Sequence, residues 1–132
     1  MFSFERSEAE DLELIPAGVR RKLDLARQKL SLAGWTRLPR EARMALVAAG
    51  DPSFEALLRE VSEAAGVALD PLGPAPAEWP WRAREAPEVL RGRLDAARWA
   101  GLDDETRYSL WKLCESRRPE AREQLAQALT EI

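Results

Sequence analysis

One pattern occurs twice in this chain, at a constant offset of 64 residues and without a gap. The pattern L-x-x-A-x-W-x-x-L-x-x-E-x-R-x-x-L begins at Leu30 and again at Leu94. Its shared residues pair as Leu30 with Leu94, Ala33 with Ala97, Trp35 with Trp99, Leu38 with Leu102, Glu41 with Glu105, Arg43 with Arg107, and Leu46 with Leu110. Self-similarity of this kind indicates two copies of one supersecondary unit, so we expect two related halves.

The spacing within the pattern predicts the end of one helix, a tight connection and the start of a second helix. A tryptophan ring can bury about 150–250 Å², so Trp35 and Trp99 are expected to fill the corners. The Glu lies near the positive end of the second helix, where a carboxylate gains about 0.3–1 kcal/mol. Arg43 and Arg107 are expected to reach back to a loop carbonyl or to the Glu. All these residues are then structural; the alternative is that the two Arg/Glu pairs form a symmetric binding surface.

Apolar residues at helical spacing, together with proline, glycine and aspartate at helix ends, predict an all-α fold of about six helices. The helices are expected at 15–34, 38–49, 51–66 and 87–101, with two more starting at 103 and 119. Gly34 is expected to end the first helix. Only the alternation of Phe2, Ser3 and Phe4 suggests extended chain.

Prolines divide the chain. We expect a single domain over 1–132, with an acidic N-terminal arm at 1–14, a three-helix unit at 15–66 and a second at 87–132. The linker at 67–86 contains Pro71, Pro74, Pro76 and Pro80, which favour extended, polyproline-like chain. The arm is either laid on the core or a partly ordered tail.

The composition narrows the function classes. The chain has no histidine and one cysteine, so it lacks the residues of zinc fingers, iron–sulfur clusters and Ser–His or Cys–His nucleophiles. We therefore predict no catalytic residue, no metal and no cofactor; a carboxylate-only enzyme is an unfavoured alternative. The net charge of −3 and the lack of a long apolar run argue against nucleic acid and membrane partners. With no signal or transit peptide, a cytoplasmic location is expected.

Two segments are candidates for binding a partner protein. Arg20, Arg21 and Lys22 are expected on the outer face of the first helix. This face is either simply solvated, or it docks onto an acidic partner or onto the chain's own residues 5–13.

The other candidate is Trp79-Pro80-Trp81, followed by Arg82 and Arg84. Trp and Arg dominate binding hot spots, but at least one of these tryptophans is expected to pin the linker to the core. The inward-facing Cys114 is expected to be a buried, unreactive thiol.

The chain resembles the nitrate reductase-associated protein family, whose members look like F-x-F-E, then I-P-x-x-V-R-x-K-L-D, then K-L-x-L-x-x-W. The matching positions are Phe2, Phe4, Glu5, Ile15, Pro16, Val19, Arg20, Lys22, Leu23, Asp24, Lys29, Leu30, Leu32 and Trp35. A later R-[FY]-x-L-x-K-L segment matches Arg107, Tyr108, Leu110, Lys112 and Leu113. The family carries cysteines where this chain has Leu14 and Gly50, so thiol chemistry at those positions is not available here.

The resemblance implies a non-catalytic accessory or maturation protein that binds a larger enzyme, an assimilatory nitrate reductase. Composition supports only the non-catalytic part of this interpretation. The alternative is a generic helical scaffold or regulator that binds another protein partner through the segment from Trp79 to Arg84.

Overall fold

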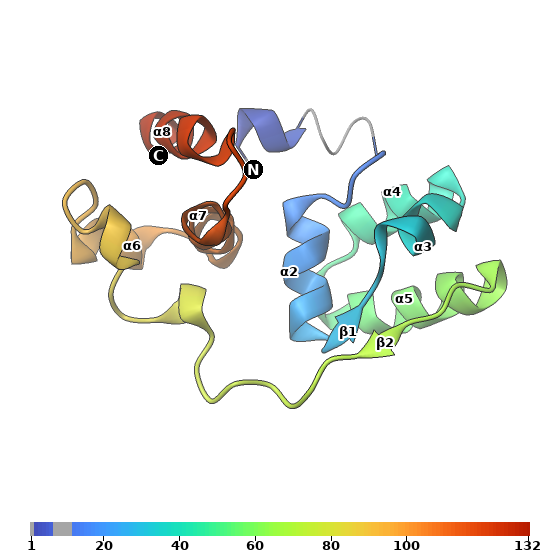
Figure 1. The fold of residues 1–132 in the computed structure, drawn as a ribbon. Helices are drawn as coiled ribbons and strands as arrows, with labels where there is room; N and C mark the ends of the chain where they lie inside the picture. The colour runs from blue at the N-terminus through green and yellow to red at the C-terminus, as the bar shows by residue number, and fades with distance from the viewer. Residues whose placement is uncertain (1, 7–11) are drawn as a thin grey trace. The chain divides into compact units, whose positions relative to one another are not determined.

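The computed structural model describes residues 2–6 and 12–132 and is mostly helical, which confirms the all-α prediction. The chain divides into two compact units (Figure 1). One comprises Glu5–Ala75; the other comprises Pro76–Ile132 with Met1–Phe4. Each unit is described by itself below.

The Glu5–Ala75 unit is built from α2 (Ala17–Leu25), α4 (Arg40–Ala48) and α5 (Asp51–Ala65), which pack against one another. The short helix α3 (Leu32–Arg37) precedes α4. Buried apolar residues from these helices and from the segment before α2 form one core. Its most completely buried members are Val19, Trp35, Leu38, Leu46, Phe54 and Leu58.

The predicted first helix over 15–34 is wrong in its second half. α2 ends at Leu25, and Arg27 takes a positive φ of 56° that turns the chain. The strand β1 (Gln28–Lys29) then pairs antiparallel with β2 (Asp70–Pro71), so the described residues contain strand where the sequence predicted none. The Leu72 N–H also donates to the Arg27 carbonyl at 2.9 Å. Because the partner strand lies far along the chain, local helix signals cannot reveal this turn.

Gly34 does not end a helix, because it lies inside α3. Ser31 caps the start of this helix, and its hydroxyl accepts from the Gly34 N–H. A Cβ at position 34 would lie 2.9 Å from the Leu30 side chain and 3.0 Å from that of Val67. This glycine is therefore required for close packing rather than for helix termination.

α4 and α5 begin and end close to the predicted residues. Pro39 precedes α4, and Gly50 precedes α5, which carries proline in its first turn. Gly66 ends α5 in the left-handed conformation, with φ 67°, which glycine adopts without a Cβ clash. These ends depend on residues within a few positions of them, which explains why the sequence predicts them.

The second unit contains α6 (Ala96–Gly101), α7 (Asp104–Glu115) and α8 (Ala121–Glu131), preceded by the 3₁₀ turns η1 (Pro80–Arg82) and η2 (Glu88–Leu90). α7 packs against both α8 and η1. Leu90, Leu94, Trp99, Leu110 and Ala128 are among the buried residues of its core.

The predicted helix over 87–101 is also wrong, because η2 and a turn at 91–93 precede α6. The Asp95 carboxylate accepts from the Arg98 N–H and starts α6 anew. Residues 3–6 are helical rather than extended, so the alternation of Phe2 and Phe4 does not mark a strand. Within the described residues, no helix has the length and apolarity needed to cross a bilayer.

The local structure of α3 and α4 is matched in α6 and α7. The bounds of α6 lie 64 residues after those of α3, and α7 starts 64 residues after α4. Ser31 and Asp95 both cap their helices with a side-chain oxygen. The Leu38 N–H donates to the carbonyl of the corner tryptophan Trp35, and the Leu102 N–H donates to that of Trp99. That these parallels reflect a true repeat stays a prediction from the sequence.

Candidate functional site

The three basic residues of α2 do not share an outer face. Arg20 is exposed, but Arg21 and Lys22 are buried, so the expectation that all three lie outward is wrong. Lys22 lies three positions after Val19, which is fully buried, and therefore on the same side of the helix. This spacing was visible in the sequence, but the charge of the lysine favoured an exposed position.

Lys22 binds the C-terminal end of α4. Its Nζ donates to the carbonyl oxygens of Leu46 at 2.8 Å, Val47 at 3.1 Å and Ala49 at 2.8 Å. It also lies 5.1 Å from the centre of the Phe54 ring. The last carbonyls of a helix lack partners within it and carry partial negative charge, so a buried ammonium is well satisfied there. Lys22 thus fixes α2 against α4 and α5.

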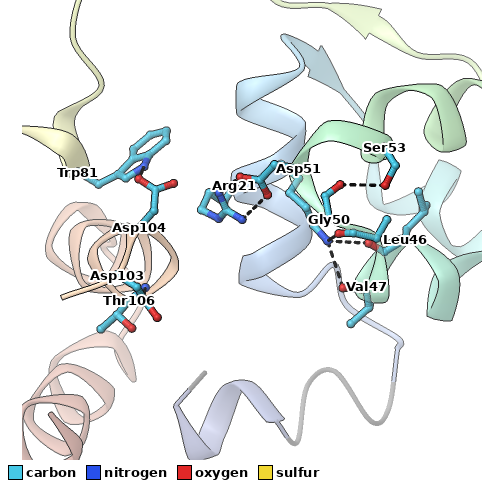
Figure 2. A network of polar contacts seen from close by, with 12 residues as sticks. Arg21, Leu46, Val47, Gly50, Asp51, Ser53, Trp81, Asp103, Asp104 and Thr106 are labelled. Carbon is cyan, nitrogen blue, oxygen red and sulfur yellow. Dashed lines mark hydrogen bonds and ion pairs between the residues drawn. The ribbon is translucent and has the colours of Figure 1, made fainter.

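Arg21 ties α2 to the start of α5. Its two terminal nitrogens lie 2.7 and 3.0 Å from the two Asp51 oxygens, in a bidentate arrangement that Figure 2 shows. Asp51 is the first residue of α5, where a carboxylate also favours the helix dipole. The Arg21 and Lys22 contacts are therefore both structural ties between helices.

The Trp79-Pro80-Trp81 segment folds into η1 and carries Trp81 into the core. Trp81 is 1% exposed, and its Nε1 donates to the Asp104 carboxylate at 3.1 Å. Its ring lies 4.8 Å from Tyr108 edge-on and 5.4 Å from Trp111. Trp79 is half-buried and lies 4.9 Å from Trp81. We call Trp79, Trp81, Tyr108 and Trp111 the tryptophan cluster; the expectation that one tryptophan pins the linker holds for Trp81.

Two basic residues flank the tryptophan cluster. Arg82 Nε lies 2.7 Å from an Asp104 oxygen, with its side chain 42% exposed. Lys112 is exposed and places its ammonium 5.0 Å from the Trp111 ring centre. Arg84, the last residue of the predicted segment, is exposed. Trp111 and Lys112 were missed as surface residues, although Lys112 follows Tyr108 by four positions and so shares its helix face.

The two corner tryptophans each hold a segment that arrives from elsewhere in its unit. Trp35 Nε1 donates to the Leu12 carbonyl at 2.9 Å, and Arg43 donates to the same oxygen at 2.7 Å. Trp99 Nε1 donates to the Ala83 carbonyl at 2.9 Å. Both indoles are fully buried. These residues are anchors of the fold.

Arg107 reaches the corner carbonyls of its own unit. It donates to the carbonyls of Trp99 at 3.0 Å and Ala100 at 2.6 Å. Arg43 thus bonds to a loop carbonyl, as the first sequence alternative states. Arg107 instead bonds to carbonyls in the last turn of α6, and among the described residues neither arginine bonds to the Glu of the pattern.

The other residues that match the family pattern in the sequence are also mostly buried. Phe2 is buried and stacks on the half-buried Phe4, and the Glu5 side chain is buried too. Ile15, Pro16, Val19 and Leu23 are buried, and Asp24 is half-buried. The predicted docking of the acidic arm onto α2 falls mostly on residues 7–11, which lie outside the described residues.

The chemistry available in the described part of the chain is limited. There, no group of three or more Cys, Asp or Glu residues is placed to hold a metal ion. Cys114 is half-buried, and burial together with the nearby Glu115 carboxylate raises the pKa of its thiol to about 11. A thiol with that pKa stays protonated at neutral pH and is a poor nucleophile.

Neither the curated proteins nor the solved structures gave a match. A family model described as "Conserved nitrate reductase-associated protein" matches residues 1–132, the whole chain. This chain is therefore a member of the conserved nitrate reductase-associated protein family.

Proposed function

We propose that this chain is a non-catalytic accessory protein that binds nitrate reductase. The observation that carries the proposal is the family match, which spans the whole chain and whose description names association with that enzyme. The raised pKa of Cys114, the one cysteine in the chain, fits a role without thiol catalysis.

The outer rings of the tryptophan cluster are the proposed contact surface. Trp79 and Trp111 are both half-buried, so each of these large aromatic residues keeps part of its surface exposed. Lys112 directly follows Trp111, Arg84 comes five positions after Trp79, and both basic residues are exposed. Aromatic and arginine side chains carry a large share of the energy in protein interfaces, whereas Arg21 and Lys22 are engaged within their own unit.

The direct test is the affinity of the full chain for purified nitrate reductase from the same organism, measured by biolayer interferometry. We expect a complex, and we expect Trp79→Ala with Arg84→Glu to weaken it at least about tenfold. Arg37→Glu is the matched control, because Arg37 is an exposed arginine of α3. Failure of the unmodified chain to bind the enzyme would overturn the proposal.

The non-catalytic part has its own test in cells grown on nitrate. Deleting the gene should lower nitrate reductase activity per amount of enzyme, and returning the Trp79→Ala, Arg84→Glu variant should restore it poorly. Nitrate turnover by the purified chain alone would instead identify it as an enzyme.

A further inference from the structure

An open groove lies in the Pro76–Ile132 unit; Leu113 and Cys114 of α7 line it, and none of the four residues of the tryptophan cluster does. It has a volume of about 790 Å³ and is bordered by η2, the end of α7 and the start of α8. Its apolar lining includes Leu90, Leu113 and Leu125, whose side chains also belong to the core of this unit. Val89 lies at the groove and is 67% exposed, more than the other exposed large apolar side chains of the described residues, Leu14, Leu32 and Met44.

The charge of the groove lining is of one sign. Four arginines line it, namely Arg93, Arg117, Arg118 and Arg122, and no Asp or Glu does. Arg118 lies 3.5 Å from a Glu120 oxygen, whereas the other three form no ion pair with any residue that the structure describes. In a chain of net charge −3, this local excess of positive charge is a distinct feature.

The backbone adds to the positive potential. α8 starts at Ala121, one of the groove residues; no side chain among the described residues hydrogen-bonds to its first N–H groups, and the acidic residue of its first turn, Glu123, does not line the groove. The first N–H groups of a helix lack partners within it and carry partial positive charge. An arginine at this position, such as Arg122, is unfavourable for the helix by itself. Bound carboxylates would offset both the helix end and the arginines.

The shape and lining favour a peptide over a small ion. A single anion would contact only one or two arginines. It would leave the exposed Val89 and the leucines that line the groove uncovered. A segment that alternates carboxylates with apolar side chains would satisfy both parts of the lining. Arginine is suited to this role because its guanidinium binds carboxylates in a bidentate geometry.

We infer that this groove, here named the arginine groove, binds an acidic, partly apolar segment of the partner protein. The inference rests on the proposed function, because the partner in question is nitrate reductase. The arginine groove gives a contact separate from the tryptophan cluster, and its positive charge orients the approach of the partner through electrostatic attraction.

The test uses the full chain and overlapping peptides that cover the nitrate reductase sequence. The peptides that bind best should be rich in Asp and Glu with apolar residues between them, and their affinity should fall as salt is raised. The double variant Arg117→Glu, Arg122→Glu should weaken binding at least about tenfold. Val89→Ser, which keeps every charge, should weaken it less, and Arg37→Glu should leave it unchanged.

Cys114 gives a second readout, because it lines the groove and is the one cysteine in the chain. A bound peptide should slow its alkylation by iodoacetamide at pH 9, and the Arg117→Glu, Arg122→Glu variant should lose this protection. Thermal unfolding of each variant checks that these exposed substitutions leave the fold intact.

The outcomes separate this inference from the proposed function. Binding of the whole enzyme that the arginine variants leave unchanged would overturn the arginine groove while the proposed function stands. Preferential binding of basic peptides, or no protection of Cys114 by bound peptides, would overturn it as well. If the whole enzyme does not bind at all, the proposed function fails, and the inference fails with it.

Discussion

Lys22 Nζ lies 2.8 Å from the carbonyl oxygen of Leu46, the fully buried residue two positions before the end of α4. The lysine that ends the basic run Arg20-Arg21-Lys22 thus serves as a C-terminal cap for another helix. Its ammonium has three carbonyl partners, so the cost of burying the charge is offset by hydrogen bonds made at the negative end of a helix.

Replacing Lys22 with methionine should destabilise the chain by about 2–4 kcal/mol, because three carbonyls near the end of α4 would lose their donor. Urea unfolding followed by far-ultraviolet circular dichroism measures this change. The control is Lys29→Met, at an exposed residue of β1, where a change within about 0.5 kcal/mol is expected. Equal effects at the two positions would contradict the capping role.

Helix ends that depend on nearby residues were predicted correctly from the sequence. Features that depend on contacts with residues far along the chain were not. The Asp103 cap of α7 and the left-handed Gly66 after α5 are local signals, and both hold. Gly34 carries the same local signal, yet Leu30 and Val67 pack where its side chain would be. Packing against a segment more than thirty positions away cannot be inferred from helix-end rules.

In the candidate site, too, local features were predicted from the sequence and contacts between distant residues were not. Burial of Trp81 was anticipated as one of two interpretations, since a proline-rich linker with aromatics needs anchoring. Its partners Tyr108 and Asp104 come from α7 and could not be named from spacing. The arginine groove was missed for a similar reason, because Arg93 and Arg122 are brought together only by the packing of the unit.

The two corner tryptophans should respond differently to loss of their N–H groups. In Trp35→Phe, the Leu12 carbonyl keeps its hydrogen bond from Arg43 at 2.7 Å. In Trp99→Phe, the Ala83 carbonyl loses the one hydrogen bond found for it among the described residues. Trp99→Phe should therefore be more destabilising, by about 1 kcal/mol, in urea unfolding of the two variants.

The double substitution Trp35→Phe, Arg43→Met tests that explanation. It should remove both donors to Leu12 and bring the cost at this corner up to or beyond that of Trp99→Phe. If the single variants cost the same and the double variant adds nothing, the shared acceptor is not the cause.

Trp79 and Trp81 should separate binding from stability. Trp81→Ala should cost about 3–5 kcal/mol, because it leaves a large cavity beside Tyr108 and Trp111. Trp79→Ala removes a half-buried ring and should cost clearly less, while weakening partner binding. Thermal unfolding measured beside binding affinity checks both; a larger loss of stability in Trp79→Ala than in Trp81→Ala would contradict the assignment of Trp81 to the core.

Cys114 should react slowly and should make stability depend on alkaline pH. With a thiol pKa of about 11, against 9.0 for an unperturbed one, its thiolate fraction at pH 8 is about 100-fold lower. The greater nucleophilicity of a more basic thiolate recovers part of this, so alkylation should be roughly tenfold slower than in a cysteine peptide. The rate should rise through pH 9 and level off only near pH 11.

The sign of the stability effect follows from the same pKa. Between pH 9 and 11 the unfolded chain releases the Cys114 proton while the folded chain keeps it, so rising pH favours unfolding. The loss should stay below about 2–3 kcal/mol, because the thiol is only half-buried. Urea unfolding of the natural chain and of Cys114→Ser at pH 8 and pH 10.5 isolates this effect. The stability difference between the two chains should shift against the natural chain at the higher pH, and a difference independent of pH would contradict the raised pKa.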